Sequence, residues 1–331
     1  MSQKISWIDN LRAMACMMVV MIHASTAQVV NFQSIHEVEW MVANLLNSAS
    51  RVCVPLFFMI SGYLFFGEKS AAKRHFLRIG LCLLFYSVVS LIYIYSLTNI
   101  GFWPSLKHIL EKPVFYHLWF FYAIVVIYLL SPFIKVKEMA GRYVLVAGIV
   151  LGVLANPQLP VMSWQGVHLF PVDLYIGGDT FYYLLYALMG RAIGMINTQK
   201  TGITVAACSL FVISTLGIAW GTRHQSLINQ NFADTFYVYC GPLVFLSAMS
   251  LFVLFKNALS AGILPGFALI SRHSLAIYGF HALIIISLRA ARLGFPQWPL
   301  VNIAFLFTCG LFGSLMLAIL LGKIDRQRWV S

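Results

Sequence analysis

Apolar runs, most of them long enough for a membrane-crossing helix, occupy most of this chain of 331 residues. A helix needs about 20 apolar residues to cross the hydrocarbon layer of a bilayer. Because 60% of the residues are hydrophobic and only 10% are charged, there are too few charges to cover a water-facing surface. We therefore predict an all-α polytopic membrane protein, a bundle of about ten transmembrane helices at residues 11–31, 43–66, 77–97, 116–134, 142–156, 179–197, 203–221, 236–255, 273–290 and 300–321. The fifth run is the weakest, since it is short and leads into a proline-containing stretch.

The lysines and arginines favour one side of this predicted bundle. With a cytoplasmic N-terminus, sixteen of the 22 lie in cytoplasmic segments, Arg51 falls inside the second run, and the opposite face holds Lys107, Lys112, Arg223, Arg289 and Arg292. Cytoplasmic loops are enriched in Lys and Arg, so this distribution predicts ten crossings with both termini cytoplasmic. No long polar segment divides the runs, and we expect residues 1–331 to form a single integral-membrane domain.

The net charge and the cysteines exclude further classes of protein. The net charge of +12 is explained by loop charges next to membrane lipids, so we expect no nucleic-acid partner. All six cysteines stand in apolar runs without the spacing of metal ligands. We therefore expect neither a disulfide framework nor a metal site.

A few titratable side chains fall inside the apolar runs, where insertion of a charge costs on the order of 2.5–3.5 kcal/mol. They are His23 in the first run, Arg51 in the second, His281 in the ninth and His117 at the outer start of the fourth, where the polar indole of Trp119 follows it. Carboxylates are absent from the middle of every run. This absence disfavours a proton- or cation-coupled transporter, which usually needs a buried Asp or Glu.

The first run carries the most informative pair, Arg12 and His23. Eleven helical positions amount to about three full turns, so both side chains share one face, with a rise of roughly 16 Å between them. Arg12 then lies at the cytoplasmic interface, where a guanidinium favours a phosphate-bearing ligand, and His23 lies near the bilayer centre, where an imidazole can transfer a proton. Two simpler interpretations stay open: Arg12 as a topological anchor and His23 as a helix–helix hydrogen-bond partner.

Other polar side chains are candidates for the lining of a site. Arg51 is either a substrate-facing cation or a buried arginine bonded to neighbouring carbonyls. In the second run, Ser61 and Gly62 either serve close helix packing or free backbone groups for a ligand. In the ninth run, Ser274, Tyr278 and His281 share a helical face that borders either a cavity or another helix. Three more candidates have alternative explanations: Arg74 and Arg78 can bind either phosphates or anionic lipid heads, and Trp119 can belong to the interfacial aromatic belt.

Four segments of the chain resemble the membrane acyltransferase-3 family. They are IDNLRAMACMMVVMIH, with an Arg, ten intervening residues and a His, then PLFFMISGYLF, HLWFFYAIVVIYLLSP and SLAIYGFH. The resemblance implies transfer of an acetyl group from acetyl-CoA, entering from the cytoplasm, to a hydroxyl of a cell-envelope polysaccharide or lipid-linked sugar. It implies a multi-pass protein of the bacterial inner membrane, matches Arg12 and His23 to the family's essential pair, and places Arg78 in its basic patch.

These observations lead to one predicted mechanism. The phosphates of CoA bind near Arg12, Arg74 and Arg78, and the thioester reaches His23, which acts as general base or forms a transient acetyl-imidazole. Acetyl-CoA is a co-substrate, and no resident cofactor is expected. The acceptor side is expected to be lined by Arg51, Ser61, His117, Trp119, Tyr278 and His281. The alternatives are a secondary transporter or flippase for an anionic or lipid-linked solute and, last, a noncatalytic assembly subunit.

Overall fold

The computed structural model describes residues 5–97, 102–164 and 167–331. Almost all of its regular structure is helical, and its only strands in these ranges form a small antiparallel hairpin, β1 (Met162–Trp164) and β2 (Val167–Phe170). The helices are α1 (Ser6–Val30), α2 (Glu37–Ser50), α3 (Cys53–Phe65), α4 (Lys73–Leu97), α5 (Phe102–Lys107), η1 (Tyr116–Leu118), α6 (Trp119–Leu130), η2 (Ser131–Phe133), α7 (Gly141–Ile149), η3 (Val150–Leu154), α8 (Asp179–Met195), α9 (Thr201–Asn229), η4 (Thr235–Tyr237), α10 (Pro242–Ala258), α11 (Phe267–Ala290) and α12 (Pro299–Ile324).

In the described ranges, eight helical segments are long and apolar enough to cross a membrane. This confirms the prediction of a polytopic, mainly α-helical membrane protein. The segments are Ser6–Val30, Glu37–Phe65, Lys73–Ser96, Tyr116–Phe133, Thr201–Asn229, Thr235–Ala258, Phe267–Ala290 and Pro299–Ile324.

The two other predicted spans form shorter helices. The apolar helix at Gly141–Leu154 combines α7 with the π-helical η3, and α8 has 17 residues. At 1.5 Å per residue these lengths fall below the roughly 30 Å of a hydrocarbon core. The total of ten crossings and the cytoplasmic position of both ends stay predictions.

The second predicted span, 43–66, corresponds to the candidate membrane span Glu37–Phe65, which starts earlier and contains a break in its helix. The helical segment begins earlier, at Glu37, and is interrupted between α2 and α3, where Arg51 forms the C-cap of α2. Pro55 accounts for the interruption, because a proline ring clashes with the carbonyl four residues before it, here that of Arg51. Arg51 therefore lies at the end of a helix, whereas the sequence predicts it inside one.

Gly62 lies where α3 and α8 pack closely against each other. A Cβ atom at Gly62 would lie 1.9 Å from the Ala187 carbonyl oxygen on α8, and one at Gly190 of α8 would lie 2.2 Å from the Met59 carbonyl oxygen on α3. Small residues let two helix backbones approach this closely. The packing interpretation of Gly62 is therefore confirmed, and α3 is fixed against α8.

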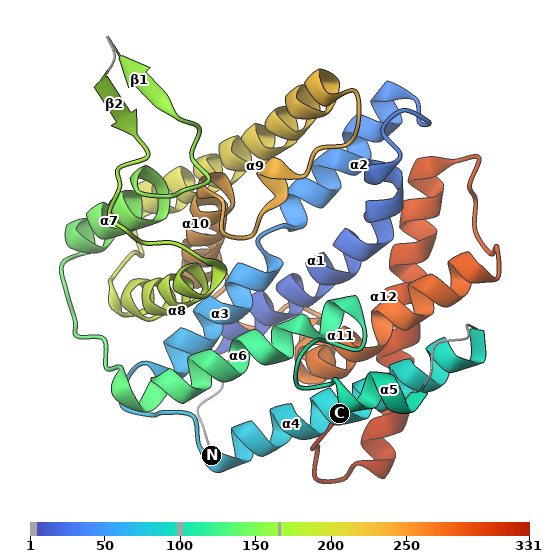
Figure 1. Ribbon diagram of the computed structural model, residues 1–331. Helices are drawn as coiled ribbons and strands as arrows, with labels where there is room; N and C mark the ends of the chain where they lie inside the picture. The colour runs from blue at the N-terminus through green and yellow to red at the C-terminus, as the bar shows by residue number, and fades with distance from the viewer. Residues whose placement is uncertain (1–4, 98–101, 165–166) are drawn as a thin grey trace.

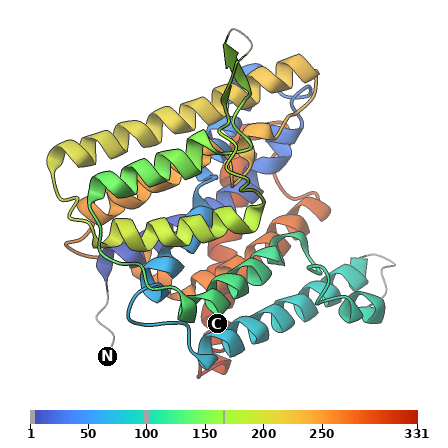
Figure 2. The same ribbon diagram turned by 60° about the vertical axis from the view of Figure 1, so that its left-hand side comes forward.

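Helix α1 passes through the middle of the molecule, between α2, α3 and α10 on one side and α11 and α12 on the other (Figures 1 and 2). Its side chains contribute to all three buried apolar clusters, through residues such as Leu11, Ala13 and Val29. An apolar helix that is buried on several sides is held in one orientation. Polar residues of α1 therefore face partners on several neighbouring elements, such as Ser271 of α11 for Arg12 and Asn47 of α2 for Ser25.

Candidate active site

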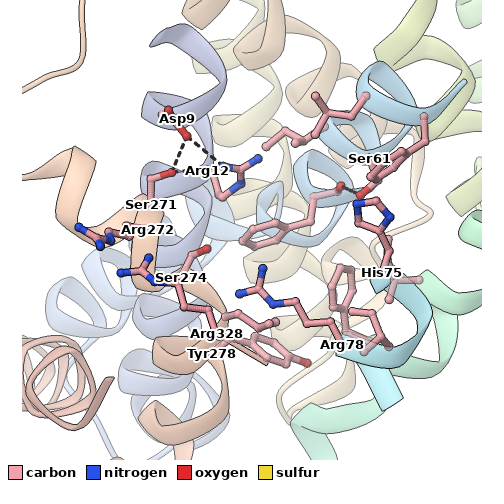
Figure 3. Close-up of a pocket in the computed structure, with 18 of the residues that line it drawn as sticks. Asp9, Arg12, Ser61, His75, Arg78, Ser271, Arg272, Ser274, Tyr278 and Arg328 are labelled. Atoms are coloured by element: carbon pink, nitrogen blue, oxygen red, sulfur yellow. Dashed lines mark hydrogen bonds and ion pairs between the residues drawn. The ribbon is translucent and has the colours of Figure 1, made fainter. Parts of the chain in front are cut away.

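A cavity of about 790 Å³ lies among α1, α3, α4, α6 and α11 (Figure 3). Part of its lining is apolar, and this part includes Phe57, Phe120 and Leu275. The charged part carries four arginines and one carboxylate: Arg12, Arg78, Arg272, Arg328 and Asp9. All four arginines belong to segments whose sequence predicts a cytoplasmic position. A cavity with this excess of cations favours an anionic ligand.

The ends of α1 and α11 hold Arg12 in a fixed orientation. Its Nη1 donates to Asp9 Oδ1 at 3.0 Å and is 3.4 Å from Ser271 Oγ, and that hydroxyl donates to the same carboxylate oxygen at 2.9 Å. The guanidinium makes no other hydrogen bond to the part of the chain that the structure describes. Its remaining N–H groups are therefore available to a ligand in the cavity.

From the sequence, Arg74 and Arg78 are equal candidates for binding phosphates. In the structure only Arg78 lines the cavity. Arg78 lines the cavity and donates from Nη2 to the Ser331 main-chain oxygen at 2.9 Å, while its buried Nε has no partner among the described residues. Arg74 is exposed on the first turn of α4 and does not line the cavity. His75 lines it instead.

Three histidines from three different helices meet next to Tyr278, one of the residues that line this cavity. The ring centroid of His281 lies 4.9 Å from that of His23 and 5.4 Å from that of His117, and the His23 and His117 rings are 6.5 Å apart. Tyr116 adds a hydroxyl 3.4 Å from His23 Nδ1. Among the described residues no group of three or more His, Cys, Asp or Glu side chains is arranged to hold a metal ion. An imidazole can take up or release a proton near neutral pH.

Backbone hydrogen bonds determine which nitrogens of two of these rings carry a proton. His281 Nδ1 lies 3.0 Å from the Ile277 carbonyl oxygen and His117 Nε2 lies 3.3 Å from that of Gly279. A carbonyl oxygen only accepts, so in the neutral rings these nitrogens carry the hydrogen. The other nitrogen of each ring, Nε2 of His281 and Nδ1 of His117, is buried and without a partner among the described residues. Each is a free acceptor beside His23.

Tyr278 connects the cavity with the histidines. It lines the cavity, its hydroxyl donates to the His117 carbonyl oxygen, and its ring centroid lies 5.5 Å from that of His117 and 6.0 Å from that of His281. Ser274 and Ser61 line the same cavity, and the Ser61 hydroxyl donates to the Phe57 carbonyl oxygen at 2.8 Å. A ligand that fills the cavity thus ends one side chain away from the histidine cluster.

Arg51 lines a different cavity, of about 310 Å³. Its Nε and Nη2 donate to Asn47 Oδ1 at 2.9 and 2.6 Å, and its guanidinium lies 4.0 Å from the Tyr237 ring centroid. Thr26, three residues after His23 on α1, lines this cavity too. Along α1, His23 therefore lies between the cavity at Arg12 and the cavity at Arg51.

The remaining predicted residue, Trp119, lies outside the lining of both cavities. Its ring packs among the rings of Tyr183 and Tyr239, with centroids 5.7 and 5.9 Å away.

Sequence reasoning overlooked three arginines of the site. Arg272 and Arg328 line the first cavity, and Arg289 Nη2 donates to the main-chain oxygens of His23 and Ala24 at 3.0 and 3.2 Å. In the sequence all three are indistinguishable from loop cations that set topology. No local motif marks them, because their positions depend on how distant segments fold back.

Comparison with known proteins gives one family. The acyltransferase-3 family, described as an acyltransferase domain, matches residues 5–323. No curated protein and no solved structure matches the chain. The match covers α1 to α12 almost entirely and includes the arginines and histidines of both cavities and of the cluster, except Arg328.

Proposed function

We propose that this chain, which belongs to the acyltransferase-3 family of membrane acyltransferases, moves an acetyl group from acetyl-CoA to a hydroxyl group of a cell-envelope sugar. The proposal rests mainly on one observation: the histidine cluster packs against Tyr278, which lines a cavity that also carries four arginines. The arginines offer cations for phosphates, and the histidines next to Tyr278 offer a base for the reacting groups.

The first cavity has the properties of a CoA thioester site. Its volume of about 790 Å³ is within the range of roughly 300–1,000 Å³ typical of ligand pockets. Arg12 and Arg78 supply planar guanidinium groups, which bind phosphate oxygens in pairs. The apolar lining at Phe57 and Phe120 would receive the pantetheine arm and direct the thioester toward Tyr278. Arg74, outside the lining, would act only at longer range.

In the proposed reaction His23 is the general base. It takes the proton of the sugar hydroxyl as that oxygen attacks the thioester carbonyl; the C–O ester bond forms, the C–S bond breaks, and the proton passes on to the CoA thiolate. A positioned base of this kind contributes typically about 10²–10⁴-fold. In the alternative route, a ring nitrogen of His23 attacks the thioester carbonyl, the C–S bond breaks, and the imidazole proton passes to the CoA thiolate. The sugar hydroxyl then attacks the acetyl-imidazole, the N–C bond breaks, and the hydroxyl proton returns to His23. The neutral His117 and His281, each with a free acceptor nitrogen, would stabilise the proton on His23 in the first route.

We place the acceptor on the Arg51 side of His23. Arg51 and Asn47 are polar groups suited to sugar hydroxyls, and Asn47 Nδ2 donates to Ser25 Oγ at 2.9 Å, two residues after His23. Donor and acceptor would then approach His23 from opposite ends of α1. Trp119, His117 and His281 would border the acceptor side only indirectly.

We also propose a specific acceptor sugar and a specific membrane for this protein. The segments VPLFFMISGYLFFGE, RHFLRIGLCL, KPVFYHLWFF and ISRHSL resemble the enterobacterial common antigen O-acetyltransferase. On this basis the acceptor is an N-acetylglucosamine unit of enterobacterial common antigen, as free polysaccharide or lipid-linked, and the protein resides in the bacterial inner membrane.

Detergent-purified protein with radiolabelled acetyl-CoA tests the proposal. We expect the wild type to release CoA and to label an added envelope glycan, and His23→Ala to lose both reactions while still binding CoA. His168→Ala, on the exposed hairpin, is the matched histidine control. A transporter would cleave no thioester. A His23→Ala variant that retains most of the activity would refute the role of His23.

A further inference from the structure

The segment that follows α12, residues 325–331, is folded back on itself by one carboxylate. Asp325 Oδ1 accepts the backbone N–H of Trp329 at 3.0 Å, and Oδ2 accepts those of Val330 and Ser331 at 2.8 and 2.9 Å. Three hydrogen bonds to one ionised group are a strong local constraint, because bonds to charged acceptors are about twice as strong as neutral ones. The segment therefore has a defined conformation.

This folded segment is attached to one face of α4. Arg78 donates to the Ser331 main-chain oxygen at 2.9 Å, Cys82 Sγ lies 3.3 Å from the Trp329 carbonyl oxygen, and the Tyr86 hydroxyl donates to the Val330 carbonyl oxygen at 2.6 Å. The three α4 residues are four positions apart, so they form one stripe along the helix. Residues 325–331 thus border the cavity at the side of α4.

Arg328 has an unusual backbone conformation for a non-glycine residue. Its φ is 56°, in the left-handed region that glycine adopts without strain. Its side chain nonetheless lines the cavity and is drawn there together with Arg78 and Arg272 (Figure 3). Strained backbone positions of this kind cluster at functional sites. A glycine would fit this backbone position without strain. Arginine instead brings a positive charge into the cavity.

The charges of the cavity are incompletely paired within the protein. Arg12 forms an ion pair with Asp9, and Arg78 donates to a main-chain oxygen of Ser331. Arg272 and Arg328 form no ion pair and no side-chain hydrogen bond with the described residues. A carrier-bound phosphopantetheine offers a single phosphodiester charge, whereas CoA carries a diphosphate and a separate phosphate on its ribose. The excess of cations matches the more highly charged ligand.

We propose that residues 325–331 form one wall of the donor cavity, that Arg328 binds a phosphate at the nucleotide end of CoA, and that Asp325 is the positioning residue for it. The inference rests on the proposed function. Its consequence is specificity: the protein uses free CoA thioesters and discriminates against donors in which phosphopantetheine is attached to a carrier protein.

Binding of four probes to the detergent-solubilised full chain tests this proposal: CoA, 3′-dephospho-CoA, 4′-phosphopantetheine and pantetheine. Arg328→Gly removes the cation and suits the left-handed backbone, so the variant should fold. We expect it to bind CoA about 10- to 100-fold more weakly, as loss of a charge-assisted bond predicts. Pantetheine binding should change less than about twofold. Arg326→Ala, an exposed arginine of the same segment, is the matched control.

Two further variants distinguish the charge of the Arg328 side chain from its position in the cavity. Arg328→Lys should recover part of the CoA affinity. Asp325→Asn should reproduce most of the Arg328→Gly loss of CoA affinity, with pantetheine again nearly unaffected.

The possible failures are distinguishable. If the wild type binds CoA and Arg328→Gly binds it equally well, this inference is wrong and the proposed function stands. Equal weakening of CoA and pantetheine in Arg328→Gly would also overturn the inference, since it would indicate a structural role. A wild-type chain that binds none of the four probes would refute the proposed function, and this inference with it.

Discussion

Replacing Arg78 by alanine should raise the KM for acetyl-CoA about tenfold and leave kcat nearly unchanged. Arg78 lines the donor cavity, its Nε is buried without a partner among the described residues, and its Nη2 holds the Ser331 oxygen. A hydrogen bond to a charged group contributes about 1.5–3 kcal/mol. Because Arg78 is only half-buried, solvent screening favours the lower figure, and about 1.4 kcal/mol corresponds to a factor of ten.

The KM increase follows from where Arg78 lies. In the proposed complex it would contact the donor far from the reacting atoms, so that ground state and transition state would lose the same interaction and only KM would change. Arg78→Lys keeps the charge but loses the planar fork, and should raise KM about threefold.

Initial rates of label transfer from acetyl-CoA measure both constants. Arg74→Ala is the natural comparison, since Arg74 is one turn away on the same helix but exposed. We expect its effect on KM to be several-fold smaller than that of Arg78→Ala. Equal effects of the two variants, or a fall in kcat at constant KM, would refute the assignment of Arg78 to the donor phosphates.

Three further predictions concern packing, pH and Tyr278. Gly62→Val should lower the thermal unfolding midpoint or prevent folding, because its Cβ would lie 1.9 Å from the Ala187 carbonyl oxygen. Burial raises the pKa of Asp325, but hydrogen bonds from the backbone of residues 329–331 lower it more, so the net shift is downward. Trp329 fluorescence should therefore report the folded segment at neutral pH and its release only well below about pH 3.9. Tyr278→Phe should reduce kcat without raising KM, since the His117 carbonyl loses its donor.

Each of these has a result that would contradict it. Gly80→Ala, at an exposed glycine with open space around it, should fold normally, and an equal loss in Gly80→Ala would remove the packing argument. Release of the 325–331 segment between pH 5 and 7 would contradict the Asp325 assignment. A Tyr278→Phe variant with unchanged kcat would show that the hydroxyl does not position the histidines.

Helix geometry and hydrophobic length made part of this site predictable. Eight of the ten predicted apolar runs correspond to long helices, because the membrane sets their length. The shared face of Arg12 and His23 follows from the helical repeat, and in the structure both contact α11, Arg12 through Ser271 and His23 through His281. Both results depend only on local periodicity.

Contacts between distant segments were not predictable in this way. His117 reaches His23 through the tertiary packing of η1. Arg328 reaches the cavity only because Asp325 folds the segment back. In the sequence these residues resemble ordinary loop or span residues, since nothing local determines their partners.

In the proposed reaction, His23 is the group at which an acetyl group passes to an envelope sugar. The most direct test is mass spectrometry of envelope glycans from cells that lack this chain and are supplied with the wild type or with His23→Gln, at equal membrane levels. We predict that only the wild type restores the acetyl mass increment on the glycan. Glycans acetylated to the wild-type extent in cells with His23→Gln would show that acetyl transfer does not depend on His23.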